Sequence, residues 1–127
     1  MDCVFCERLT SGAFVAANDL AVAILDGFPL SRGHCLILPR RHEPDFLALT
    51  PDEQLAIWAL VHPARQHIER EGIPDGYNIG INIGLPAGQT VLHAHLHVIP
   101  RYRGDVADPR GGVRCVIPGK ARYWEPR

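Results

Sequence analysis

The sequence predicts an α+β fold with one five-stranded antiparallel β-sheet, one main helix and a short N-terminal helix. Short apolar segments rich in β-branched residues alternate with turn-forming residues, which is typical of sequential antiparallel strands. One longer stretch, residues 51–71, has the amphipathic spacing of a helix. The chain has 127 residues, of which 46% are hydrophobic, so residues 1–127 are expected to form one domain.

The first part of the chain is expected to form a short helix and then three strands. The helix covers residues 4–10 and ends at Ser11 and Gly12, which favour loops and turns. Asn18 and Asp19 make a tight turn that joins the first two strands into a hairpin. The expected strand ranges are 14–18, 20–25 and 34–40.

The main helix follows the third strand and precedes the last two. Thr50 and Glu53 have the spacing of a capping box, and Pro51 suits the first helical position. The helix should end at Gly72, and Pro63 within it should kink or split it, because proline lacks the backbone N–H that an inner turn needs. The remaining strands are expected at 77–83 and 92–101.

Three histidines, His93, His95 and His97, alternate along the last expected strand. Side chains alternate faces along a strand, so the three imidazoles should share one face and the apolar residues between them the other. Imidazole can bind a metal, carry a proton or act as a nucleophile. One metal ion is a poor explanation for the whole row, because residues i and i+4 of a strand are about 13 Å apart.

The charge and the N-terminal sequence exclude several classes of protein. The formal net charge of −1 gives no bulk attraction to nucleic acid or to a membrane surface. No signal peptide is expected, and no apolar stretch approaches the roughly 18 residues of a membrane span. We therefore expect a cytoplasmic protein, in which thiols stay reduced.

The four cysteines fall into two groups. Cys35 and Cys115 lie in apolar segments and are expected to be buried small hydrophobic residues. Cys3 and Cys6 have the Cys-x-x-Cys spacing of metal ligands, and a closed tetrahedral zinc site needs two more. His42, in the turn after the third strand, and His93, at the start of the histidine row, are suitable. The candidate zinc ligands are thus Cys3, Cys6, His42 and His93.

The segment 82–90, which precedes the histidines, is rich in small residues that let backbone N–H groups approach a phosphate. Gln89 and Thr90 add side-chain donors. Such a composition is also typical of an ordinary loop between two strands. The three adjacent histidines are what favour the anion-binding interpretation.

Taken together, these motifs resemble the histidine triad (HIT) family of nucleotide hydrolases and transferases. Residues 93–99 fit the family motif His-φ-His-φ-His-φ-φ, in which φ is apolar, and residues 87–91 and 32–34 also look like the family. The set of two cysteines and two histidines is similar to the zinc site of many bacterial members. The resemblance covers residues 3 to about 105 and implies a HIT-like fold whose sheet is extended by homodimerisation.

The resemblance also implies roles for individual residues. The middle histidine of the family attacks the α-phosphorus of a nucleotide and forms a covalent nucleotidyl intermediate, so His95 would be the nucleophile. His97 would contact the phosphate oxygens, and His34 would support the triad from the neighbouring strand. The other implied substrate contacts are a ribose-binding acid, phosphate-binding loop residues and walls for the base, namely Asp26; Asn82, Gly88, Gln89 and Thr90; and Ile24, Phe28 and Leu36.

The chemistry is consistent with these roles. A neutral imidazole attacks phosphorus through Nε2, which requires a proton on Nδ1, and a backbone carbonyl would fix that tautomer. Charge on the phosphate oxygens needs donors that are already in place, for which His97, Gln89 and Thr90 are suited. The reaction needs no catalytic metal and no organic cofactor, so a zinc ion at the N-terminal site would be structural.

The C-terminal arm, residues from about 106 to 127, departs from the best-known branches of the family. Residues 101–127 contain seven of the thirteen basic residues but only three acidic ones. The arm could reach toward a long polyphosphate or be a solvated tail, and residues 113–117 could form a short extra strand.

Four functions remain open. The first is cleavage at the α-phosphate of a dinucleoside polyphosphate, such as diadenosine tetraphosphate, by a homodimeric enzyme that binds neither nucleic acid nor membrane. The second is a nucleoside phosphoramidase in which Thr90 helps to protonate the leaving amine. The third is a metal-dependent hydrolase, and the fourth is a non-catalytic nucleotide-binding module.

Overall fold

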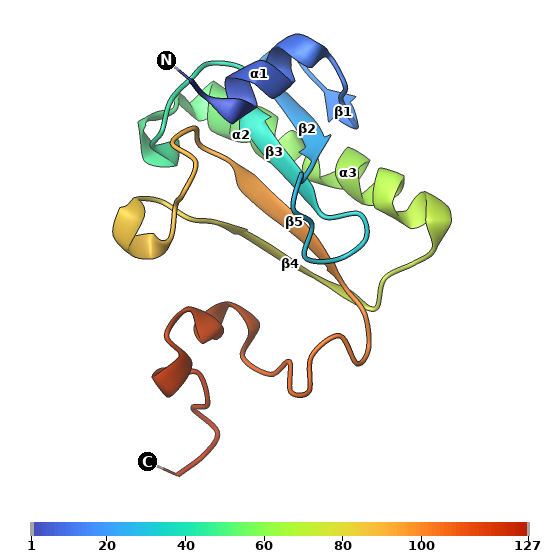
Figure 1. Cartoon of the computed structure of the whole chain (residues 1–127), viewed down its shortest axis with the longest axis vertical. Helices are drawn as coiled ribbons and strands as arrows, with labels where there is room; N and C mark the ends of the chain where they lie inside the picture. Colours follow the sequence, from blue (N-terminus) through green and yellow to red (C-terminus); the bar gives the residue numbers. More distant parts are fainter. Residues whose placement is uncertain (1, 127) are drawn as a thin grey trace.

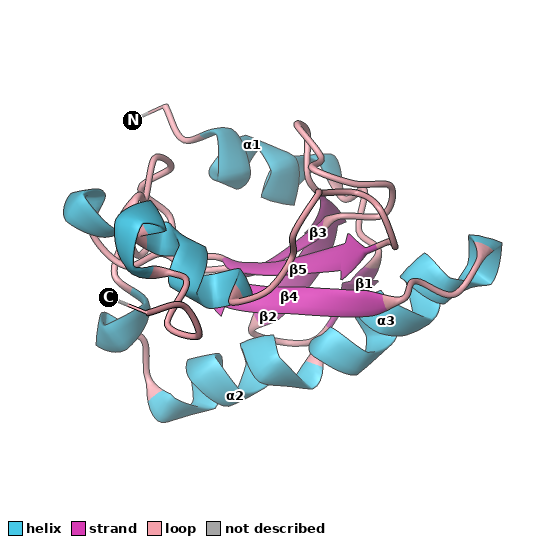
Figure 2. Ribbon diagram, turned by 90° about the horizontal axis from the view of Figure 1, so that it is seen from below, coloured by secondary structure: helices cyan, strands magenta, loops and turns pink. Residues whose placement is uncertain are grey.

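The computed structural model describes residues 2–126 and contains a five-stranded antiparallel sheet between two layers of helix (Figures 1 and 2). The predicted α+β fold is therefore confirmed. The sheet has the order β1-β2-β3-β5-β4, which places β4 at one edge. Its strands are β1 (Ala16–Ala17), β2 (Ala21–Leu25), β3 (Cys35–Pro39), β4 (Gly76–Ile81) and β5 (Leu96–Arg101).

Helix α1 (Val4–Ser11) lies over one face of the sheet, and α2 (Pro51–Ala59) and α3 (Val61–Ile68) lie over the other (Figure 2). Helix α1 ends at Ser11 and is capped by Gly12, whose φ of 72° is the left-handed conformation that glycine adopts readily. None of the helices in the described part of the chain has the length and apolar character needed to cross a bilayer.

The predicted main helix is split. Helix α2 ends at Ala59, α3 begins at Val61, and a 3₁₀ turn, Glu69–Glu71, extends it to Gly72. The break has a local cause, because Pro63 has no N–H to donate to the carbonyl four residues earlier. The other 3₁₀ turns lie in the connections and in the arm: Phe46–Ala48, Leu85–Ala87, Gly112–Val116 and Pro118–Lys120.

Each face of the sheet has its own apolar core. The face toward α2 and α3 carries the alternating residues of the central strands, including Ile37, Leu96 and Val98. The opposite face carries Leu36 and Leu38 and packs against α1. The alternation predicted for the histidine row is thus correct for its apolar half, because Ala94, Leu96 and Val98 all belong to the helix α2–α3 side.

Three predicted strands were too long, one of them because β4 ends at Ile81 and not at residue 83. The first strand covers only Ala16–Ala17, and β5 begins at Leu96, so His93 and His95 precede the strand. The β-ladder does not continue to residues 93–95, because the backbone groups that would extend it have other hydrogen-bond partners. The Ala94 N–H donates to the Glu43 carbonyl at 2.7 Å, and the Pro39 carbonyl is 2.8 Å from His93 Nε2.

Two expectations for the C-terminal part were wrong. Residues 113–117 do not form a strand, because Gly112–Val116 is a 3₁₀ turn. Cys115 is exposed, whereas Cys35 is fully buried as predicted. The arm leads away from the end of β5 and lies beyond β4, so Cys115 is not enclosed between the sheet and a helix (Figure 1).

The capping box of α2 is present. Thr50 Oγ1 accepts from the Glu53 N–H at 3.1 Å, and Glu53 Oε1 accepts from the Thr50 N–H at 3.0 Å. The substitution Thr50→Ala should lower the free energy of unfolding by about 1 kcal/mol, because it removes the acceptor for an N–H at the helix start. Urea denaturation monitored by circular dichroism would measure the loss. Thr10→Ala, at an exposed helical threonine, is the matched control, and an equal effect of both would contradict this account.

Candidate active site

A cavity of about 350 Å³ lies between α1, the loop after β2 and the segment that leads into β5. Most of the predicted substrate and catalytic residues line it, although they come from distant parts of the chain. They are Asp26, Phe28, His34, Leu36, Asn82, Gly88, Thr90, His95 and His97. The sheet brings them together because β3 and β5 are neighbours, with Leu36 opposite His97 in register.

His95 is held in one tautomer. Its Nδ1 is 2.8 Å from the carbonyl oxygen of His93, so Nδ1 carries the proton and donates it. Nε2 is then left with its lone pair, which is the form that can attack phosphorus. Burial lowers the pKa of His95 below its usual value and keeps the ring neutral.

His97 and His34 form a second, connected pair. The Leu30 N–H donates to His34 Nδ1 at 3.1 Å, so His34 carries its proton on Nε2. That Nε2 is 3.0 Å from His97 Nδ1, which accepts, and the proton of His97 must therefore be on Nε2. Burial, then the neighbouring His95 and His34, lowers the pKa of His97 to about 4, so His97 offers a neutral N–H donor.

Asp26 lies beside this pair. One carboxylate oxygen is 3.4 Å from His34 Nε2, and the other accepts from the Phe28 N–H at 2.8 Å, which shapes the loop after β2. Burial lowers the pKa of His34, while Asp26 acts in the opposite direction. The carboxylate is only partly covered, so it remains within reach of a ligand in the cavity.

The loop before β5 differs from the prediction at one residue. Gln89 does not line the cavity, and its side chain is 3% exposed. The amide nitrogen donates to the carbonyls of Pro44 and Val91 at 2.7 and 3.2 Å, and its oxygen accepts from the Gly84 N–H at 2.9 Å. Gln89 therefore fixes the loop and is not free to donate to a phosphate.

Of the three residues predicted to contact the nucleotide base, two line the cavity and one does not. Leu36 and Phe28 line the cavity, and Phe28 is 92% exposed, so its ring is available to a ligand. Ile24 is fully buried in the core beneath and does not line the cavity, because its side chain packs inside that core cluster.

Helix α1 supplies residues that the sequence did not indicate. The Phe5 ring meets His95 edge-on, with ring centroids 4.9 Å apart and planes at 82°, and Val4 and Arg8 also line the cavity. The sequence did contain one indication, because Phe5 lies between the two candidate metal ligands Cys3 and Cys6. A metal bound by these cysteines would hold the segment against the sheet and with it the Phe5 ring beside His95.

The predicted metal ligands come together. The ligand atoms of Cys3, Cys6, His42 and His93 all lie within 4.8 Å of one another. His93 Nδ1 is 3.6 Å from each sulfur, and His42 Nδ1 is 3.4 Å from the Cys6 sulfur. A tetrahedral zinc ion, at about 2.3 Å from sulfur and 2.0 Å from nitrogen, would separate such atoms by roughly 3.5 Å. The four residues therefore fit zinc.

The surroundings of this cluster also fit a metal. The other ring nitrogen of His93, Nε2, donates to the Pro39 carbonyl at 2.8 Å, which is the usual support for a metal-binding imidazole. Burial, and then the adjacent Cys3, raises the pKa of the Cys6 thiol. A divalent cation would offset this and allow both thiols to ionise.

Comparisons with known proteins agree with this geometry. The family model for the HIT domain matches residues 9–104. An uncharacterised HIT-like protein from Saccharolobus solfataricus is 37% identical over 106 residues, which are 81% of this chain and 76% of that protein. The structure of a histidine triad family protein from Mycobacterium smegmatis, described as zinc-bound, has a TM-score of 0.74 and 38% identity over 85% of this chain and 81% of that one.

Two other relatives have names that state an activity. An adenylylsulfatase from Arabidopsis thaliana is 35% identical over 107 residues, which are 82% of this chain and 54% of that protein. An asymmetrical bis(5'-nucleosyl)-tetraphosphatase from Schizosaccharomyces pombe is 38% identical over 89 residues, which are 70% of this chain and 49% of that protein. The chain thus spans about half the length of these two relatives.

The metal site can be tested by stoichiometry and stability. Purified protein should bind one zinc ion per chain, and Cys6→Ala should lose the ion and melt at a lower temperature, because it removes a thiolate ligand. Metal analysis and a thermal melt, each with and without chelator, measure both effects. Cys115→Ser, at an exposed cysteine remote from the cluster, should change neither. Full zinc content in Cys6→Ala would contradict the assignment.

The low pKa of His97 predicts a dependence of stability on pH. The folded pKa is about 4 and the ordinary value is 6.5, so between these values the unfolded chain binds more protons than the folded one. The contribution of neutral His97 to the free energy of unfolding is therefore complete above pH 6.5, and it is lost as the pH falls toward 4. Urea denaturation across this range should show the decline, and His97→Asn should make it shallower. An unchanged slope in His97→Asn would contradict the assignment.

Proposed function

This chain belongs to the HIT domain family, and on that premise we propose that it is an enzyme that cleaves nucleotide substrates at the α-phosphate through His95. The observation that carries the proposal is the 2.8 Å hydrogen bond from His95 Nδ1 to the His93 carbonyl, because it leaves Nε2 free at the cavity wall. The names of the adenylylsulfatase and the bis(5'-nucleosyl)-tetraphosphatase support a nucleotide-processing function.

The proposed reaction has two displacements. In the first, His95 Nε2 forms a bond to the α-phosphorus while the bond from phosphorus to the leaving group breaks, which gives a covalent nucleotidyl-histidine. In the second, water or another acceptor attacks phosphorus and the N–P bond returns its electron pair to His95. With water, the product is a nucleoside monophosphate.

The surrounding residues bind and orient the substrate. The Nε2–H of His97 would donate to a phosphate oxygen, and His34 would hold His97 in that tautomer. Gly88 and Thr90 would face the phosphate, where Gly88 lets the backbone approach closely, and Asn82 would add an amide. Asp26 would bind the ribose hydroxyls, with Phe28 and Leu36 against the base.

Dinucleoside polyphosphates such as diadenosine tetraphosphate are proposed substrates, because one relative carries that activity in its name. Nucleoside phosphoramidates are the second candidate. The observation that favours them is the exposed Thr90 hydroxyl on the cavity wall, which could protonate a leaving amine.

The other two interpretations have less support. A metal held by Asp26, His34 and His97 would use atoms that lie within 4.8 Å of one another. Their hydrogen bonds argue against metal binding. His34 Nδ1 already accepts from the Leu30 N–H, and His34 Nε2 donates to His97 Nδ1. A purely nucleotide-binding role would not require the fixed tautomer of His95, whose free Nε2 lone pair is needed only for attack on phosphorus.

Zinc at the N-terminal cluster is proposed to be structural, because none of its four ligands lines the cavity and the ion would fix α1 against the sheet. We also propose a cytoplasmic homodimer, in which the partner pairs with an edge of the sheet. The exposed backbone groups of an edge strand such as β4 are suited to this role.

Catalysis can be tested by intact mass. Brief mixing with diadenosine tetraphosphate or adenosine 5'-phosphoramidate should add one nucleotidyl group to the native chain and none to His95→Ala. We expect His95→Ala to lower kcat by at least about a thousandfold, since it removes the nucleophile. His97→Gln should cost about a hundredfold, the usual effect of losing one phosphate donor.

The matched control is His62→Ala, at an exposed histidine on α3. It should keep both the adduct and the rate. Equal turnover by His95→Ala and the native protein would overturn the proposed mechanism. The absence of adduct and product with folded native protein would instead favour a binding role.

A further inference from the structure

One permanent positive charge lines the active-site cavity. Among the described residues that form the cavity wall, Arg8 is the only lysine or arginine. Arg8 lies one helical turn after Val4 on α1, so both side chains project from the same face of the helix. Helix α1 thus brings the Phe5 ring against His95 and a guanidinium group to another part of the same cavity.

The guanidinium of Arg8 is anchored at the end of β2. Its Nη2 donates to the Leu25 carbonyl at 2.9 Å, and Leu25 directly precedes Asp26. In the sheet, β3 lies between β2, which carries Leu25, and β5, which carries His97. Two strand spacings amount to roughly 10 Å. Arg8 is therefore held at the end of the cavity that would take the nucleoside, away from the reacting phosphate beside His97.

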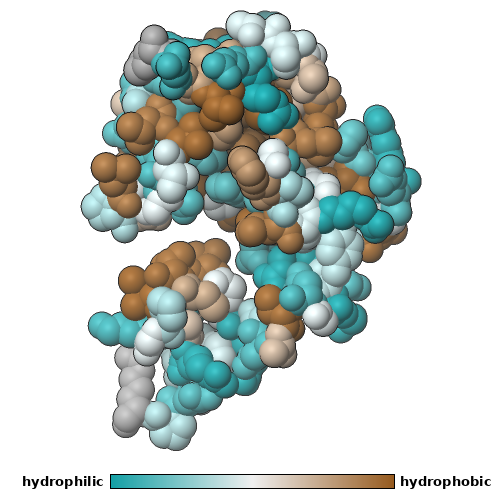
Figure 3. Space-filling view, in the orientation of Figure 1, coloured by the Kyte–Doolittle hydropathy of each residue, from teal (hydrophilic) through white to brown (hydrophobic). Residues whose placement is uncertain are grey.

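This end of the cavity suits a nucleotide base. Phe28 and Leu36 offer one aromatic and one aliphatic wall. In the view of Figure 3, apolar and hydrophilic side chains lie side by side over the core below α1. A base that packs against the two walls would have its faces covered, while its polar edge would still need hydrogen-bond partners. Arg8 is the side chain on this wall that can supply several donors.

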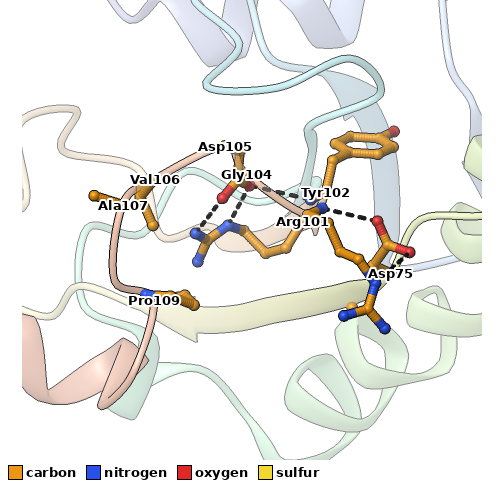
Figure 4. Close-up of a pocket in the computed structure, with 10 residues that line it drawn as sticks. Asp75, Arg101, Tyr102, Gly104, Asp105, Val106, Ala107 and Pro109 are labelled. Atoms are coloured by element: carbon orange, nitrogen blue, oxygen red, sulfur yellow. Dashed lines mark hydrogen bonds and ion pairs between the residues drawn. The ribbon is translucent and has the colours of Figure 1, made fainter.

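The donors of Arg8 are largely unused. A guanidinium carries five N–H groups in a planar fork, and the contact with Leu25 occupies one end of it. In the described part of the chain, no ion pair joins Arg8 to an acid. Arg101 is a contrast, because Figure 4 shows its guanidinium bound twice to Asp105, with both distances 2.7 Å. The charge of Arg8 is therefore available to a ligand.

Guanine and adenine present different edges to such a fork. Guanine has two adjacent acceptors, O6 and N7, which an arginine can bind through two parallel N–H bonds. Adenine has the same N7 acceptor beside the N6 amino group, which is itself a donor. A guanidinium that faces adenine would set one donor against another, and the second hydrogen bond would be lost. An arginine at the base edge therefore favours guanine.

From these observations we propose that Arg8 determines the base preference of the enzyme and that its preferred substrates are guanosine nucleotides. The guanidinium would bind O6 and N7 of the base while Phe28 and Leu36 cover the ring. This inference rests on the proposed function, and it names the nucleoside that His95 would carry in the covalent intermediate. Adenosine nucleotides would use the same walls without the paired contact and would be the poorer substrates.

The test compares the 5'-phosphoramidates of guanosine, adenosine and inosine, which share one leaving group. For the native protein we expect kcat/KM to be about tenfold higher for the guanosine compound than for the adenosine compound, because one paired arginine contact discriminates to about this extent. Inosine keeps O6 and N7 but lacks the 2-amino group, so it should react nearly as well as guanosine. A preference for guanosine that inosine does not share would overturn the role of Arg8.

Two variants test the contact itself. Arg8→Met keeps an unbranched side chain but removes every donor, so the guanosine-to-adenosine ratio should fall toward one, chiefly through a lower kcat/KM for guanosine. Arg8→Gln should shift the ratio further toward adenosine, because an amide offers a donor to N7 and an acceptor to the N6 amino group. If Arg8→Met lowers both values equally, Arg8 has a structural or phosphate-binding role and the proposal is wrong.

Arg40→Met is the matched control. Arg40 Nε also donates to a backbone carbonyl, that of Asn18 at 3.1 Å, but Arg40 does not line the cavity. This variant should keep the native ratio. A loss of the preference in Arg40→Met equal to that in Arg8→Met would contradict a direct contact between Arg8 and the base.

Calorimetric titration of the native protein with guanosine and adenosine monophosphates gives a readout that needs no turnover. We expect the guanosine compound to bind about tenfold more tightly, and Arg8→Met to remove the difference. Equal affinities and equal kcat/KM values would overturn the base preference, while the turnover itself still supported His95 catalysis. A lack of adduct and product from all three phosphoramidates would overturn the proposed function, and the titration would then decide the base preference alone.

Discussion

The position of His93 is the constraint on which the rest of the site depends. Its ring faces the two cysteine sulfurs through Nδ1 and the Pro39 carbonyl through Nε2, while its own carbonyl accepts from His95. The backbone of His93 lies outside the β-ladder, which begins at Leu96. Its carbonyl therefore has no partner in the ladder and accepts from His95 Nδ1 at 2.8 Å. One residue thus connects the candidate metal cluster with the nucleophile.

The neutral state of the histidines follows from the same packing. His34, His93 and His95 are at most 6% exposed, and the loss of hydration that a charged imidazole would suffer there lowers the pKa of each ring. For His34 and His95, burial outweighs the opposite effect of the Asp26 carboxylate. Each ring therefore remains neutral, and its single proton is placed by a neighbouring donor or acceptor. Leu30 determines the tautomer of His34, and His34 determines that of His97. A neutral His97 can still donate to a phosphate, and a neutral His95 can attack one.

The sequence was sufficient where a pattern is local. Alternation predicted the apolar face of β5, the Thr50–Glu53 spacing predicted a helix start, and Cys-x-x-Cys with two histidines predicted a cluster that does form. The sequence-based prediction failed where a residue distant in the chain determines the orientation of a side chain. Gln89 turns from the cavity because the Pro44 carbonyl, 45 residues earlier, accepts its amide. The position of Phe5 likewise depends on how α1 packs over His95, and the Cys-x-x-Cys spacing around it indicates only that this segment is tied to the sheet.

The arm shows why composition alone misleads about charge. Seven basic residues between 101 and 127 suggest a polyphosphate-binding surface, yet Arg101, Arg110 and Arg114 are bound to acids, carbonyls or aromatic rings nearby. The side chains that the arm turns toward β4 and β5 are Val113 and Val116, which line a cleft of about 360 Å³ there. Strand β5 therefore has two chemically different halves on one face: His97 at the reaction centre and Ile99, one step further on the same face, among aliphatic side chains. Because one strand carries both side chains, the spacing between His97 and Ile99 is fixed by the sheet.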